Sequence, residues 1–232
     1  MPESVQALGR RARKAAATRR RILAAAEELF VRDGYAATAI TEIAARADVA
    51  VQTVYAVFGT KRAVLTELID ARIMGDASPL PDAPAAGEPL SHDRLNHDRA
   101  DPLRGLPEWQ AMENEPDPRR QLARFAAIAT GIDARIAALD EVESAAAGAD
   151  PDLAEIYRRR QQRRYHAQQR LARTLAARGA LRPGLSPERA TDILWALSNP
   201  RTYRALAIQR GWTDEEYQHW LADLLASALL PA

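Results

Sequence analysis

The stretch GYAATAITEIAARADVAVQTVYAVFGTKRAVL, residues 34–65, decides the fold, because it places short helices between breaks in a definite order. Just before it, residues 22–30 carry apolar side chains at the spacing of one helical face, and this first helix ends at Gly34. Thr38 is the expected N-cap of a second helix. A third helix is predicted over about residues 51–58, and the chain breaks after it, at Gly59-Thr60.

The two short helices are joined by Asp48-Val49-Ala50, and a longer helix lies on each side of the pair. This arrangement is typical of a helix-turn-helix, whose second helix enters the DNA major groove. Spacing alone does not prove DNA binding, because any small helical domain can have it. The order of the residues through the stretch is the more specific signal.

That order closely resembles the DNA-binding domain of the TetR family of transcriptional regulators, over roughly residues 18–70. The positions that match are Gly34-Tyr35, Thr38, Ile40, Ile43-Ala44, Ala47, Val49, Thr53, Tyr55, Phe58 and Lys61. The resemblance implies that Thr41, Thr53, Tyr55 and Lys61 face DNA phosphates or base edges. Three positions depart from the family's pattern: Ala50 replaces a capping Ser, Gln52 a small residue, and Val57 a His or Tyr.

The chemistry of these side chains agrees with a role at DNA. Hydroxyl and ammonium groups donate to phosphates, which fixes the register of the protein without reading sequence. Gln52 can pair with adenine and is the expected base-reading residue, although a solvated Gln that touches only water is the alternative. The full expected DNA-binding set is Thr38, Thr41, Val51, Gln52, Thr53, Tyr55, Ala56 and Lys61.

The composition of the chain limits the class of protein and the compartment that can be expected. The chain has 232 residues, 47% of them apolar, no cysteine and a net charge of +1. The first 62 residues hold 11 Lys and Arg against 6 Asp and Glu, so the positive charge gathers at the start. No run approaches the roughly 18 apolar residues that a membrane span needs, and we expect a cytoplasmic protein with no membrane partner.

Residues 1–17 are expected to form a basic disordered arm before a helix-turn-helix domain at 18–62. Seven of the twelve residues from Arg10 to Arg21 are Lys or Arg, which suits an arm that reaches the DNA backbone or minor groove. A tail that only aids solubility is the alternative. A connecting helix is predicted at 63–75.

Residues 76–117 are expected to be a Pro-rich linker or insertion, since residues 76–120 hold eight of the 14 prolines. The repeat HDRLNHDR, 92–99, brings two His and two Asp together, but without a helix to hold them a polar linker is favoured over a metal site. A short helix is predicted at 108–113, with Trp109 docked on the core.

Residues 118–232 are expected to form a larger helical domain for effector binding and dimerisation, which makes the fold class all-α. Arg160 and Arg164 fall in the middle of the apolar stripe of one long helix. Either they pair with internal carboxylates or extend to the surface, or they line a cavity and meet a polar or anionic small molecule. The expected ligand-binding set is Phe125, Ile128, Ile132, Tyr157, Arg160, Arg164, Trp195 and Tyr203.

The last helices carry broad apolar stripes, and the resemblance implies that they pair with a second copy of the chain. The expected dimer interface is Ile193, Leu197, Tyr217, Trp220, Leu221, Leu224, Leu225 and Ala228. The prediction is therefore a dimeric, ligand-responsive regulator, usually a repressor in this family, that binds a near-palindromic double-stranded DNA operator. An architectural DNA-binding protein without an effector is the alternative. No catalytic constellation, metal site or cofactor site is expected, so we predict that the chain is not an enzyme.

Overall fold

The computed structural model of the protein describes residues 2–75 and 102–231. Every regular element in these residues is helical, which confirms the all-α prediction. The described residues divide into two compact units, one made of residues 2–75 and 142–154, and the other of residues 102–141 and 155–231. The predicted linker and the His-Asp-Arg repeat lie largely or wholly in residues 76–101, outside the described part.

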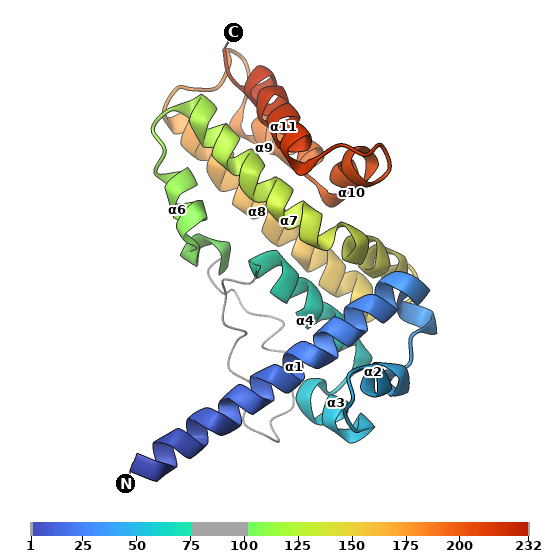
Figure 1. The fold of residues 1–232 in the computed structure, drawn as a ribbon. Coiled ribbons are helices and arrows are strands. Elements are labelled where there is room, and N and C mark those ends of the chain that lie inside the picture. The colour runs from blue at the N-terminus through green and yellow to red at the C-terminus, as the bar shows by residue number, and fades with distance from the viewer. Residues whose placement is uncertain (1, 76–101, 232) are drawn as a thin grey trace. The chain divides into compact units, whose positions relative to one another are not determined.

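Unit 1 begins with four helices: α1 (Pro2–Ala37), α2 (Ile40–Arg46), α3 (Val51–Phe58) and α4 (Lys61–Met74), shown in Figure 1. Ile22, Phe30, Ile43, Phe58 and Leu65 are among its largest fully buried side chains. They come from all four helices, so α2 and α3 are braced by one apolar core. Burial of this kind stabilises by about 25 cal/mol per Å² of apolar surface.

Two expectations for the start of the chain are wrong. The segment predicted as a disordered arm is helical from Pro2, as the first part of α1. Residues 10–21 are rich in Ala and Arg and contain no Gly or Pro, so nothing in them stops a helix from extending upstream. The predicted first helix does break at Gly34, whose φ of 81° and ψ of 165° are not helical. The N-cap of α2 is Ala39, not Thr38.

Unit 1 also contains residues 142–154, where a long hairpin turns. Asp150 opens the second arm of this hairpin, because its Oδ1 accepts from the amides of Asp152 at 2.9 Å and Leu153 at 3.2 Å. Arg62, in the first turn of α4, donates from Nη1 to Oδ2 of Asp152 at 2.5 Å and lies 3.6 Å from Oδ1 of Asp150. The start of α4 is thus tied to the turn of the hairpin.

Unit 2 contains most of α7 (Pro118–Ala147) and α8 (Pro151–Ala177), two long helices that lie side by side (Figure 1). Before them come η1 (Pro102–Gly105) and α6 (Pro107–Glu113). After them come α9 (Pro187–Leu197), α10 (Pro200–Tyr203), the π-helical turn η2 (Arg204–Ile208) and α11 (Asp214–Leu229). Trp109 of α6 is buried in the core of this unit, as expected.

The helix ends of unit 2 are capped by residues of the usual types. Ser186 caps α9 by accepting from the amide of Arg189, and Thr213 and Glu216 form a capping box at the start of α11. Gly179, after α8, has a φ of 65°, which favours glycine. Within the described ranges, no helix is both long enough and apolar enough to cross a bilayer.

Candidate DNA-binding surface and effector region

Helix α3 separates an apolar face from a polar one. Val54 and Phe58 are buried, each with 1% of its surface exposed, and they hold the helix against the core of unit 1. Gln52, Tyr55 and Ala56 are exposed, and Tyr55 has 52% of its surface in solvent. A tyrosine that exposes half its surface presents both its ring and its hydroxyl to a partner.

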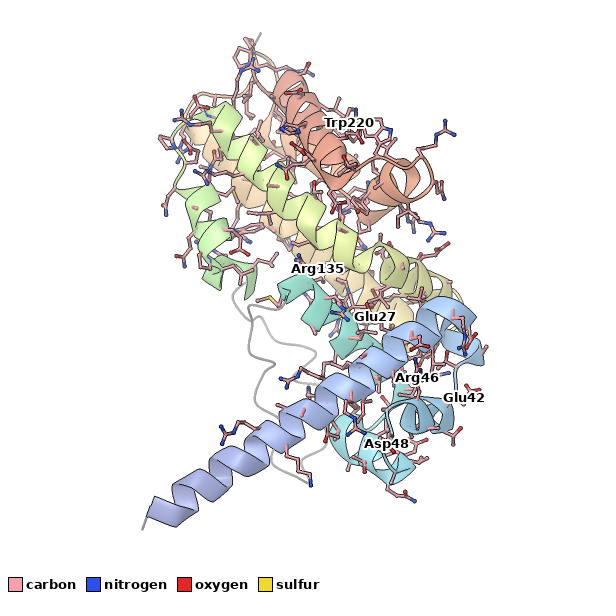
Figure 2. All side chains as sticks on the ribbon, in the orientation of Figure 1. Glu27, Glu42, Arg46, Asp48, Arg135 and Trp220 are labelled. Carbon is pink, nitrogen blue, oxygen red and sulfur yellow. The ribbon has the colours of Figure 1, made fainter. Side chains whose placement is uncertain are left out.

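The other residues of the expected DNA-binding set divide by their burial. Thr41 on α2 is exposed, whereas Val51 and Thr53 on α3 are half-buried. Both α2 and α3 therefore place side chains of this set at the surface. Asp48, in the turn between the two helices, has a φ of 51°, an uncommon value for a residue other than glycine (Figure 2).

Thr38 is not available to DNA. It is 1% exposed, and its hydroxyl donates to the carbonyl oxygen of Gly34 at 2.8 Å. Its side chain therefore closes the break at the end of α1. In a sequence, a threonine just before a helix suggests an N-cap. Here its hydroxyl instead donates to a carbonyl oxygen at the end of the preceding helix.

Lys61 is half-buried and faces the backbone of the same break. Its Nζ lies 2.7 Å from the carbonyl oxygen of Tyr35, 2.9 Å from that of Thr38 and 3.5 Å from that of Ala36. It also lies 4.4 Å from the centre of the Tyr35 ring. Burial lowers the pKa of Lys61 below its usual value. Lys61, the expected phosphate donor, thus donates its hydrogen bonds to the backbone of its own domain.

Two arginines of the basic N-terminal run also bond to other parts of unit 1, Arg19 from a buried position and Arg21 from an exposed one, which the sequence analysis missed. Arg19 is 4% exposed, forms an ion pair with Glu67 of α4 and lies 5.1 Å from the centre of the Phe58 ring. Burial raises the pKa of Glu67 to about 7, against the opposing effect of Arg19. Arg21 donates from Nε to the carbonyl oxygen of Ala47 at 3.0 Å. The sequence indicates this role only by position. Arg19 lies on the α1 face that carries Ile22 and Ala26, and Arg21 lies next to that face.

The expected ligand-binding residues are partly core and partly surface. Phe125 and Tyr203 are buried, and the Tyr203 hydroxyl donates to Oδ1 of Asp214 at 2.5 Å. Ile128, Ile132 and Tyr157 are half-buried. Trp195 is 39% exposed, so it does not wall an enclosed cavity in this structure.

Arg164 is held by the protein itself. Its Nη1 donates to the carbonyl oxygens of Ser198 at 2.5 Å and Trp195 at 3.3 Å, and its guanidinium lies 5.0 Å from the centre of the Trp195 ring. Carbonyls at the end of α9 attract a cation because they carry the negative end of the helix dipole. These contacts hold Arg164 within the chain, but through backbone carbonyl oxygens and not through the internal carboxylates that the sequence suggested.

Two carboxyl groups that sequence reasoning missed lie among these arginines. Asp133 is 4% exposed, and burial raises its pKa to about 8, against the opposing effect of Arg164. Burial likewise raises the pKa of Asp140, against the effects of Arg201, Arg164 and Arg160. Both acids could have been found, because they follow Ala126 at intervals of seven residues on the inner face of α7.

The hollow described in unit 2 lies elsewhere. It is lined by Trp109, Met112, Glu113, Gln121, Ala167, Arg170, Leu171 and Thr174, and it has about 20 Å³ of space for water-sized groups. That is room for about one water molecule and far below the several hundred Å³ of a drug-sized site. None of the expected ligand-binding residues lines it.

The expected dimer residues also divide. Tyr217, Leu221 and Leu225 are fully buried within the chain's own core, so they cannot form a surface for a second copy. The prediction is corrected for those three residues. They lie on the stripe of α11 that packs against α9 within the same chain. Partial exposure remains at the other five: Ile193, Leu197, Trp220, Leu224 and Ala228. Trp220 of α11 is labelled in Figure 2.

In the described ranges, 2–75 and 102–231, no group of three or more His, Asp or Glu side chains is placed to hold a metal ion.

Comparison with known proteins identifies the N-terminal helices. The family described as "Bacterial regulatory proteins, tetR family" matches residues 22–68. A search of curated proteins found no match to the chain.

Solved structures share the fold over nearly the whole chain. One is a putative transcriptional regulator from Saccharomonospora viridis in complex with choline, at 19% identity and a TM-score of 0.64, covering 92% of this chain and 98% of that one. Another is NalD, the secondary repressor of the MexAB-OprM multidrug efflux pump in Pseudomonas aeruginosa, at 22% identity and a TM-score of 0.62, covering 93% and 98%. A third is the transcriptional regulator FadR from Bacillus subtilis in complex with stearoyl-CoA, at 14% identity and a TM-score of 0.62, covering 90% and 97%.

Proposed function

We propose that this chain, which belongs to the TetR family of transcriptional regulators, is a repressor that binds a near-palindromic operator as a homodimer and is released by a small molecule. The observation that carries the proposal is the division of α3 into a buried face and an exposed polar face. A helix so short is stabilised by its buried residues, and it leaves Gln52 and Tyr55 free to meet a duplex.

The proposed contact surface consists of Thr41, Gln52, Thr53, Tyr55 and the small side chains Val51 and Ala56. The hydroxyl groups suit phosphate oxygens, which fix the register of α3 on the duplex. Gln52 suits an adenine edge, for which a bidentate contact gives ~1–3 kcal/mol of discrimination. The small side chains allow α3 to approach the groove closely.

The proposed dimer forms through the residues of α9 and α11 that the chain's own core leaves partly exposed. Ile193, Leu197, Trp220, Leu224 and Ala228 supply apolar surface, and the exposed Trp195 adds to it. A two-fold dimer places two copies of α3 on successive major grooves, ~34 Å apart or a multiple of that.

The proposed effector site lies in unit 2, near Phe125, Ile128, Ile132, Tyr157 and Tyr203. Two proteins of similar fold were solved with choline and with stearoyl-CoA, which supports a small-molecule role without naming the ligand. Since Arg164 is held by the carbonyl oxygens of Ser198 and Trp195, an effector needs no anionic group to satisfy it. The charge of Arg160 opposes the raised pKa of Asp140, after the larger effects of Arg201 and Arg164.

One measurement tests the release step. Purified protein is bound to a duplex that it has selected from a random pool, and small-molecule extracts of cells are added. The proposal expects some extracts to release the duplex in a saturable way. Selective binding that no extract reverses would favour an architectural DNA-binding protein, the second candidate, and the observation that favours that candidate is the exposure of Trp195, which was expected to wall a cavity.

A further inference from the structure

The basic residues of unit 1 raise a question that the proposed function leaves open, namely which cations contact DNA and which shape the domain. Lys61 is the clearest case. An ammonium group has three N–H donors. Three backbone carbonyl oxygens, those of Tyr35, Thr38 and Ala36, lie within 3.5 Å of its Nζ.

These carbonyls belong to a single structural feature, the break between α1 and α2. The break begins at Gly34, whose positive φ turns the chain, and the Thr38 hydroxyl closes it from the other side. The carbonyl oxygens at the end of a helix have no partners within the helix. Lys61 supplies those partners, and the Tyr35 ring, 4.4 Å away, covers the ammonium.

The other end of α2 is held in the same way. Arg21 of α1 donates from Nε to Ala47 O at 3.0 Å and from Nη2 to Asp48 O at 2.5 Å. Asp48 has a φ of 51° and forms the turn that leads from α2 into α3 (Figure 2). Because such a backbone conformation is costly for aspartate, a donor on its carbonyl helps to hold the turn.

We infer that Lys61 and Arg21 are positioning residues, which clamp the two ends of α2 and so fix how α3 presents Gln52 and Tyr55 to DNA. This inference rests on the proposed function, and it changes the role of Lys61 from a phosphate contact to a clamp. Lys61 comes from α4 and Arg21 from α1, so two helices outside the helix-turn-helix set its geometry.

The two roles predict different salt dependence. A lysine that neutralises one phosphate contributes about 0.9 to the slope of log K against log salt, for specific and non-specific duplexes alike. A clamp contributes nothing to that slope. Its loss misplaces α3, which lowers specific affinity and leaves the non-specific, phosphate-driven affinity unchanged.

The test compares Lys61→Met, which keeps the aliphatic stem, with Lys14→Met, which removes the chain's other lysine, an exposed residue of α1. Binding is measured for the selected duplex and for a scrambled one, over a range of salt. For Lys61→Met we expect specific affinity to fall tenfold or more, non-specific affinity to stay within twofold, and the slope to stay the same. Lys14→Met should leave the ratio of the two affinities unchanged.

A second variant and a second readout guard against a folding defect. Lys61→Arg keeps the charge, but a planar guanidinium cannot converge on the same three oxygens, so selectivity should not be restored. Thermal unfolding without DNA should show Lys61→Met less stable than Lys14→Met. Any one of three results would overturn the clamp. These are a salt slope lowered by about one in Lys61→Met, full selectivity in Lys61→Arg, and equal melting temperatures for Lys61→Met and Lys14→Met. A wild-type protein with no selectivity would instead refute the proposed function, and the melting comparison would still decide on the clamp.

Discussion

Gln52 and Tyr55 keep their polar groups in solvent, whereas Lys61, Arg19 and Arg21 bond to other parts of unit 1, Arg21 from the surface. At the scale of single residues, then, charge is a poor guide to which side chains meet DNA. A cation withdrawn from solvent needs partners; Lys61 finds them in carbonyl oxygens at a helix end, and Arg19 in the carboxylate of Glu67.

Tyr55→Phe tests the role of an exposed hydroxyl on α3. The ring remains, so packing and stability should change by less than ~0.5 kcal/mol, as for most surface substitutions. Loss of a hydroxyl that donates to a phosphate should weaken binding to every duplex by a similar factor. Equal binding by wild type and variant in a filter or fluorescence titration would remove Tyr55 from the contact surface.

Asp133→Asn tests the buried carboxyl of α7. Its pKa is near 8 in the folded chain and about 3.8 when unfolded, so the folded state binds more protons between these values. Stability should therefore fall as pH rises through this window, by up to ~1.4 kcal/mol per pH unit. Asparagine removes this titration. In thermal unfolding from pH 5 to 8, the stability of the variant relative to the wild type should therefore increase as the pH rises. Parallel curves would contradict the assignment.

At the scale of elements, the helix boundaries are the part that the sequence predicts well. Val51–Phe58, the Gly34 break, the Ser186 cap and the Thr213 capping box are local signals, and each is found in the structure. The sequence does not show whether an apolar helix face packs in the chain's own core or remains at the surface for a partner. Leu221 and Leu224 share one apolar stripe of α11, yet the first is core and the second is half-exposed.

That division yields a paired prediction for the dimer. Leu224→Glu places a charge on the outer side of α11 and should give a folded monomer by light scattering. Leu221→Glu places it in the chain's own core, where it should destabilise folding by more than about 4 kcal/mol. A Leu224→Glu variant that stays dimeric would show that the interface lies elsewhere.

The link from Arg62 to Asp150 and Asp152 predicts a second element-scale effect. The Arg62 side chain is 30% exposed, so removal of the pair with Arg62→Met should cost at most ~1 kcal/mol of stability. If the hairpin turn passes the effector signal to α4, the variant should keep DNA affinity and need more extract for release. Arg189→Met, which removes an exposed pair with Asp192 in unit 2, serves as the matched control. Identical release curves for both variants would remove the link from the mechanism.

At the scale of the whole molecule, the fold class and the resemblance of the N-terminal helices to the TetR family follow from the short stretch 34–65 and from helical periodicity along the rest of the chain. The candidate effector region does not follow from them. Its acids, Asp133 and Asp140, meet its arginines only after α7 and α8 pack together, and no spacing in the sequence records that pairing.

The account turns on α3 reading DNA in a dimer, and selection from random duplexes tests this most directly. The wild type should select two inverted half-sites whose centres lie about one helical turn, or a multiple of it, apart. Gln52→Ala, selected in parallel, should lose its preference at one base pair of each half-site and keep the others. No enriched sequence for the wild type, or the same sequence for both proteins, would contradict the account.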